Sequence, residues 1–324
     1  MKMINSVIKK GSRYEPGEIR LDGGTGPLTY MCIVDDVMEI YKVDKTFQII
    51  APEKSDPTES NPDMPFMATV VSDEGSGSDI NARVFIQAHE SYKNLIQQDE
   101  KFNDIVKALH NTKKYLLDAN KIKRKIEADI IIEYGKLPIK NKHAYTFVPY
   151  VCDLEKDINI FLMNAKLSIQ NVVLLFNSFF NANISGPRFD KVMKYLINNS
   201  KDNTDLYKIA TEIEPNISYI VDMRNAQEHP NENKKLLIKN IAILPNEEMQ
   251  KPTIQYNNEG PFDIITEFNE IVAFLVDSFE VFTLHCLMEY LSPKYKCKII
   301  SVPQEYVDPK CPIKYRVTIN LPFK

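Results

Sequence analysis

The sequence predicts a mainly α-helical protein, organised as an up-and-down helical bundle. Apolar residues recur with the 3.6-residue period of a helix across residues 153–181 and again across 262–291. Shorter stretches elsewhere alternate in polarity, as strands do, and are separated by segments rich in Pro, Gly, Ser and Asn. We therefore expect a bundle with an inserted β-hairpin and a C-terminal strand pair, preceded by a mixed β/α N-terminal region.

The N-terminal region is expected to span residues 1–139, and no motif in it assigns a role. Residues 1–80 have the short apolar runs and turn residues of strands and loops. Residues 80–137 have a helical pattern with breaks near 97–100. The Pro-containing segment 138–149 is the expected linker to the next domain.

The helical domain is expected to span residues 140–292. After its first helices, Pro215 is expected to begin a new helix, because proline is tolerated in the first helical turn. The helical patterns before Pro215 cover residues 153–181, 187–199 and 205–213.

Two strand pairs complete the expected fold. The first is a β-hairpin inserted in the helical domain at residues 234–257, before the last long helix. The second lies in the C-terminal extension 293–324, where residues 296–302 and 313–321 alternate in polarity. We expect both pairs to join in one small sheet.

The composition is that of an ordinary globular protein, with 44% hydrophobic and 26% charged residues. The net charge of −4 excludes a protein that binds nucleic acid over its whole surface. The five cysteines are scattered and never spaced as Cys-x-x-Cys, which predicts reduced thiols in a cytoplasmic protein. The most apolar stretch, 271–291, includes charged residues and predicts a buried helix rather than a membrane span.

A polar motif interrupts the apolar face of the helix that begins near Pro215. The inward-facing positions of this helix lead to Arg224, which is followed by Asn225. His229 precedes proline, and a residue before proline is pushed out of the α region, so the helix should end at or just before His229. We expect this break to bring the imidazole of His229 beside the guanidinium of Arg224.

The motif Arg224-Asn225-x-x-x-His229 resembles the R-x(4–6)-H signature of HEPN ribonucleases, in which a polar residue usually follows the arginine. The resemblance covers at most residues 140–291. It implies a bundle of four or five helices, with the motif at the end of the penultimate core helix. It also implies an endoribonuclease that uses no metal or cofactor and leaves 2′,3′-cyclic phosphate ends.

The resemblance further implies a role for each residue of the motif. Arg224 would hold the scissile phosphate, His229 would act as general base or acid, and Asn225 would orient the phosphate or the imidazole. Family members place two motifs across a dimer axis, which implies a homodimer with a composite active site. Because the family includes toxins and antiviral-defence effectors, a cognate antitoxin or defence protein is a candidate partner.

The same residues also have an ordinary structural interpretation. Arg224 would then form an i,i+4 ion pair with Glu228, and His229 would be a loop residue. A second match to the motif, Arg83-x5-His89, has an apolar residue after the arginine and is expected to be an ordinary part of a helix. The alternative functions are a catalytically inactive HEPN-like module that binds RNA or protein, and a helical scaffold.

A basic run in the N-terminal helical pattern is the candidate contact with an RNA backbone. The alternative interpretation is a solvated helix face. No metal site is predicted, because Asp222, Glu228 and His229 are close in sequence but lack the spacing of a metal-ligand motif. The basic run consists of Lys113, Lys114, Lys121, Lys123, Arg124 and Lys125.

Overall fold

The computed structural model describes residues 21–229 and 234–320, and these fall into two compact units. The second unit is the continuous stretch Asn111–Tyr290, and the first contains the residues on either side of it. This division differs from the expected one, because helix α3 (Phe102–Tyr134) runs unbroken through the boundary. The C-terminal residues from Leu291 onward are part of the first unit, together with the N-terminal residues. They are therefore not a separate extension of the helical domain.

The first unit contains a four-stranded antiparallel sheet in the order β1-β2-β3-β4. Ile40, Phe47 and Ile49 form the buried core of this sheet. The strands and the short helix that follows the third of them are β1 (Tyr30–Val34), β2 (Val37–Tyr41), β3 (Thr46–Ile50), α1 (Pro52–Ser55) and β4 (Met67–Ser72).

Helices follow the sheet where the sequence predicts them. A π-helical segment, η1 (Ile80–Ile86), leads into α2 (Gln87–Ile96), and the expected break separates α2 from α3. The C-terminal strands β12 (Lys296–Ser301) and β13 (Tyr315–Asn320) pair in a two-stranded sheet, with a short 3-10 turn, Gln304–Tyr306, between them. The expectation that they join the inserted hairpin is therefore wrong.

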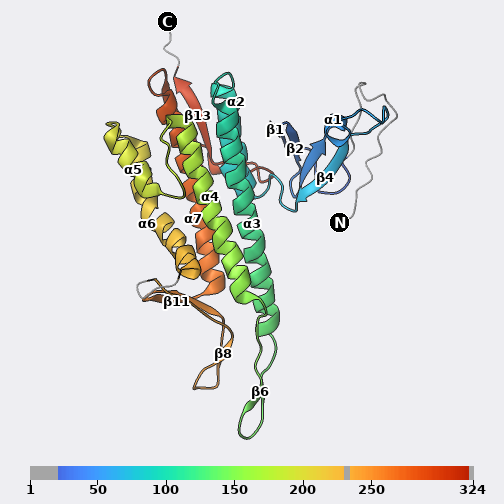
Figure 1. Ribbon diagram of the computed structural model, residues 1–324, viewed down its shortest axis with the longest axis vertical. Coiled ribbons are helices and arrows are strands. Elements are labelled where there is room, and N and C mark those ends of the chain that lie inside the picture. The colour runs from blue at the N-terminus through green and yellow to red at the C-terminus, as the bar shows by residue number, and fades with distance from the viewer. Residues whose placement is uncertain (1–20, 230–233, 321–324) are drawn as a thin grey trace. The chain divides into compact units, whose positions relative to one another are not determined.

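The second unit is a helical bundle, which makes the chain mainly α-helical. Its long helices run in alternating directions along the bundle (Figure 1). Stacked rings of Phe161 and Phe268, with centroids 3.9 Å apart, join the fourth helix to the seventh. Burying each such side chain contributes about 2–3 kcal/mol. With the later part of α3, the helices are α4 (Leu154–Phe180), α5 (Phe189–Asn198), α6 (Asp205–Glu228) and α7 (Ile264–Leu291).

Helix α6 is longer than the sequence predicts, because Pro215 lies inside it and does not begin it. The helix starts at Asp205, after Thr204, whose side chain accepts a hydrogen bond from the backbone of Tyr207 at 3.2 Å. Proline removes one hydrogen bond from a helix interior. Buried side chains on both sides of it, Ile213 and Ile217, show that packing overrides this local preference.

The inserted hairpin is confirmed, and it has a third strand that the sequence did not predict. Strand β10 lies between β11 and β7, and both pairings are antiparallel. The described strands of this region are β7 (Leu236–Lys239), β8 (Ala242–Ile243), β9 (Met249–Gln250), β10 (Thr253–Tyr256) and β11 (Glu259–Asp263). The expected linker contains a small hairpin of β5 (Ile139–Lys140) and β6 (Tyr145–Phe147).

Helices α4 and α7 are long and apolar enough to cross a membrane, judged by length and composition alone. Their most apolar windows are 61% and 67% buried by the rest of the chain. Buried core helices of soluble proteins have the same character, so this observation is weak evidence for a membrane span.

Candidate functional site

Helix α6 ends where the sequence predicts. Glu228 is its last residue, and His229 leaves the helical conformation with φ −136° and ψ 67°. The backbone N–H of His229 donates the final hydrogen bond to the carbonyl of Asn225 at 2.8 Å. Pro230, from which the prediction was made, lies outside the described residues.

Arg224 lies one turn before this end and is only 7% exposed. Its Nη2 donates a hydrogen bond to Oε1 of Glu228 at 2.7 Å. Its Nη1 is buried and has no hydrogen-bond partner among the described residues. A single chain therefore already buries most of the Arg224 side chain, and the homodimer that the resemblance implies stays a prediction.

Asn225 is held from the neighbouring helix. Lys166 of α4 donates a hydrogen bond from Nζ to Oδ1 of Asn225 at 2.8 Å, and the same Nζ lies 3.6 Å from Oε2 of Glu228. Arg224, Asn225, Glu228 and Lys166 thus form one polar cluster, the α4–α6 cluster, with two cations and one carboxylate. No sequence pattern indicates Lys166, which lies 59 residues before Asn225.

His229 is exposed at the end of α6. Among the described interactions, none joins its imidazole to Arg224, so the expected contact between the two side chains is not seen. The part of the ordinary interpretation that concerns Arg224, its ion pair with Glu228, is observed. The geometry therefore brings Arg224 and Asn225 into one cluster and leaves His229 in solvent at its edge.

Gln227 makes a second polar contact between α6 and α4. Its Nε2 donates to the carbonyl oxygen of Glu155 at 3.4 Å, a long hydrogen bond. Its Oε1 is buried without a hydrogen-bond partner in the described part of the chain. Two unsatisfied polar atoms, this one and Nη1 of Arg224, thus lie within the last two turns of one helix.

The predicted basic run does not form one exposed stripe. Lys113 is only 3% exposed and is therefore excluded from a surface contact with RNA. Lys123 donates a hydrogen bond to Asn269 of α7 at 2.6 Å, and Lys125 pairs with the buried Asp157 of α4. Both thus link helices of the bundle. The remaining three members, all exposed on α3, are Lys114, Lys121 and Arg124.

The second match to the motif is structural, as expected. Arg83 and His89 are 5% and 4% exposed. Arg83 pairs with Asp79 at 3.3 Å, and Nδ1 of His89 is hydrogen-bonded to the hydroxyl of Tyr30 at 2.6 Å. Both side chains are thus held inside the first unit.

Comparison of the chain with protein-family models, with curated proteins and with solved structures finds no match. The functional argument therefore depends on the chemistry of the α4–α6 cluster. A guanidinium binds a carboxylate and a phosphate through the same paired N–H groups. Glu228 thus occupies at least part of the position that a phosphate would take on Arg224.

Proposed function

We propose that this chain is a HEPN-type endoribonuclease, whose Arg224 is held by Glu228 until RNA displaces that carboxylate. The observation that carries the proposal is the buried guanidinium of Arg224, with Nη2 bonded to Glu228 and Nη1 without a described partner. An unsatisfied buried polar group costs about 1–3 kcal/mol. A phosphate that offers oxygens to both nitrogens would remove this cost.

The proposed reaction needs only groups of the chain and of the RNA. The ribose 2′-hydroxyl attacks the adjacent phosphorus, the bond to the 5′-oxygen breaks, and the products carry a 2′,3′-cyclic phosphate and a 5′-hydroxyl. Arg224 would stabilise the charge that gathers on the phosphate oxygens. His229, which is exposed, would transfer the proton at the 2′-hydroxyl or at the leaving oxygen.

The charge balance of the α4–α6 cluster supports binding of an anion. Arg224 and Lys166 carry two positive charges against the single carboxylate of Glu228. Glu228 is the more exposed partner of the ion pair, at 39% of its side chain against 9% for Arg224. Its carboxylate can therefore turn toward solvent when a phosphate takes its place on Arg224, so that the buried guanidinium keeps an anionic partner.

One arginine and one histidine make a sparse catalytic site. We therefore propose that two copies of the chain form a homodimer in which two Arg224–His229 pairs face one RNA strand. We also propose that the protein acts in the cytoplasm as a toxin or antiviral-defence effector. Its partner would then be an antitoxin or another defence protein. Light scattering of the purified chain tests the dimer separately from the reaction.

A cleavage assay on mixed-sequence RNA in the presence of a chelator tests the activity. We expect cleavage by the wild-type chain and its loss, by at least about a hundredfold, in Arg224→Met and in His229→Ala. Arg188→Ala and His143→Ala, which change exposed residues outside the cluster, serve as matched controls and should retain activity. Activity that survives both Arg224→Met and His229→Ala would contradict the proposal.

The second candidate is a HEPN-like module that binds RNA or protein without cutting. It is favoured by one specific observation, the ion pair that engages Arg224 within its own helix. Binding of intact RNA that Arg224→Met weakens, with no cleavage by the wild-type chain, would select this candidate. A monomer without RNA binding would select the helical scaffold.

A further inference from the structure

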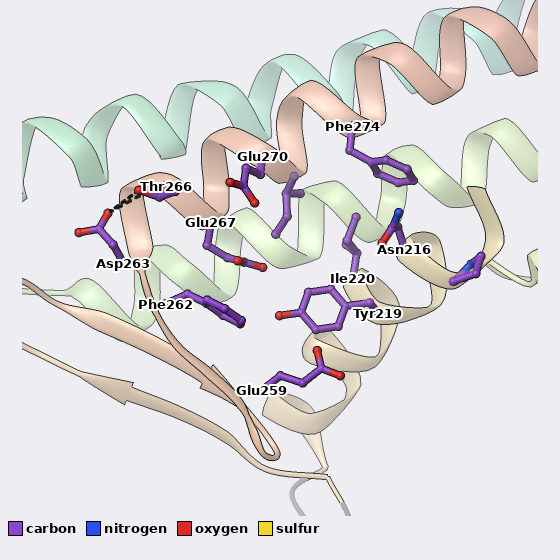
Figure 2. A pocket seen from close by; sticks show the side chains of 12 residues that line it. Asn216, Tyr219, Ile220, Glu259, Phe262, Asp263, Thr266, Glu267, Glu270 and Phe274 are labelled. Carbon is purple, nitrogen blue, oxygen red and sulfur yellow. Dashed lines mark hydrogen bonds between the residues drawn. The ribbon is translucent and has the colours of Figure 1, made fainter. Parts of the chain in front are cut away.

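A pocket of about 720 Å³ lies between α6, β11 and α7, separate from the α4–α6 cluster. Figure 2 shows Tyr219 of α6 reaching into it, with Glu267 and Glu270 of α7 and Glu259 of β11 around the same space. A pocket of this size is in the range that holds small molecules. We call it the α6–α7 pocket.

The α6–α7 pocket is strongly negative. Its described lining includes no Lys or Arg but four carboxylates. One of the four, Asp263, caps α7 by accepting hydrogen bonds from the backbone N–H and the hydroxyl of Thr266 at 3.0 and 3.2 Å. The other three, Glu259, Glu267 and Glu270, are left facing the pocket without a lining cation.

Glu267 is the buried member of these three carboxylates. It is only 9% exposed, and burial raises its pKa, helped by the nearby charges of Glu270 and Glu259. The hydroxyl of Tyr219 bonds to this carboxylate and partly opposes the rise. A cation bound among these groups would compensate carboxylate charges that repel one another.

Aromatic and aliphatic side chains form the remaining walls. Tyr219, Phe262 and Phe274 line the space, together with the buried Ile271. Tyr219 is braced by Tyr256, whose ring packs edge-on against it at 5.7 Å. Ammonium groups bind favourably over aromatic faces, and methylene chains pack on apolar walls.

The arrangement of the carboxylates favours an extended cation over a single metal ion. Among the described residues, no group of three or more His, Cys, Asp and Glu side chains is placed to hold one metal ion. Glu267 and Glu270 are three residues apart on α7, which places them about one turn, or roughly 5 Å, apart along the helix, and Glu259 comes from the separate strand β11. Charges spaced in this way match ammonium groups that are separated by short methylene chains.

We propose that the α6–α7 pocket binds a linear aliphatic polyamine. Its ammonium groups would lie against Glu267, Glu270 and Glu259, and its methylene chain would pack along Phe274 and Ile271. This site is independent of the proposed ribonuclease activity, because none of its lining residues belongs to the α4–α6 cluster.

Isothermal titration of the RNA-free, full-length chain with spermidine tests the proposal. We expect saturable binding of one molecule per chain with a sub-millimolar Kd. Glu270→Gln changes an exposed residue and should weaken binding about tenfold, and the double variant Glu267→Gln/Glu270→Gln should weaken it further. Glu212→Gln removes an exposed carboxylate of α6 outside the pocket and should leave the Kd unchanged.

Magnesium chloride and a lysine-rich peptide are titrated in parallel. Magnesium that binds as tightly as spermidine and displaces it would overturn the polyamine assignment, as would a peptide that binds more tightly than spermidine. Spermidine binding that the double variant leaves unchanged would place the polyamine elsewhere on the acidic surface. Absence of saturable binding up to millimolar spermidine would overturn the site itself.

Discussion

Arg224 donates a hydrogen bond to Glu228 at 2.7 Å, and this pair occupies the last turn of α6, immediately before His229. The pair joins a buried guanidinium to a half-exposed carboxylate. On the proposed function, the same contact that stabilises the end of the helix competes with phosphate for Arg224.

Glu228→Gln should therefore bind RNA more tightly than the wild-type chain, by about three- to tenfold. The change removes the negative charge next to Arg224 and keeps the size of the side chain, and the amide oxygen of Gln can still accept a hydrogen bond from Nη2. Fluorescence anisotropy with a short RNA at fixed salt measures the effect. Glu212→Gln is the charge-matched control on the same helix, and weaker RNA binding by Glu228→Gln than by this control would refute the competition.

Arg224→Met should leave the fold intact while it removes RNA binding. Replacing one partner of an ion pair by an apolar residue of similar length fills the space of the stem, and it also eliminates the unsatisfied Nη1. We expect the free energy of unfolding, from urea titration, to change by less than about 1.5 kcal/mol. A larger loss would mean that Arg224 is chiefly a structural residue.

The end of α6 can be predicted from the sequence because the effect of proline on the preceding residue is local. Lys166 cannot, because its contact with Asn225 depends on the register of two helices that are far apart in sequence. The predicted helix start at Pro215 is wrong for a related reason. The buried neighbours Ile213 and Ile217 stabilise the helix on both sides of the proline, and their burial depends on tertiary packing. The α6–α7 pocket could not be predicted from the sequence. One of its walls is strand β11, whose sequence Glu-Gly-Pro-Phe-Asp is typical of a turn rather than of a strand.

Pro215→Ala should stabilise the second unit. Alanine restores the missing backbone hydrogen bond of α6 and has the highest helix propensity, although it also increases the entropy of the unfolded chain. We expect a net gain of about 1–2 kcal/mol in the free energy of unfolding from urea titration. A lower stability would show that the proline ring makes contacts that the helix needs.

Glu267→Gln should stabilise the protein at neutral pH but not in acid. The pKa of Glu267 is raised on folding above its ordinary value of 4.5. Between the two pKa values the folded chain binds more protons than the unfolded chain, so its stability falls as pH rises through this window. Urea titrations should therefore show a gain in the free energy of unfolding for the variant at pH 7 and none at pH 4. A gain that is equal at both pH values would contradict the assigned cause.

Tyr41→Phe should destabilise the first unit. The Tyr41 hydroxyl donates to the buried carboxylate of Glu39 at 2.6 Å, and His110 lies 2.8 Å from the other oxygen. Removing the hydroxyl leaves that carboxylate with one donor fewer and should cost about 1–3 kcal/mol. Tyr306→Phe, at a residue that is 75% exposed, is the matched control and should be neutral in the same urea titration.

Mass spectrometry of the RNA ends produced by the purified chain, in the presence of a chelator, tests the central claim most directly. The account predicts fragments with 2′,3′-cyclic phosphate and 5′-hydroxyl ends, which disappear when His229 is replaced by alanine and when the 2′-hydroxyl at the cleaved position is replaced by a 2′-methoxy group. Fragments with 3′-hydroxyl ends, or intact RNA at every concentration of the wild-type chain, would contradict it.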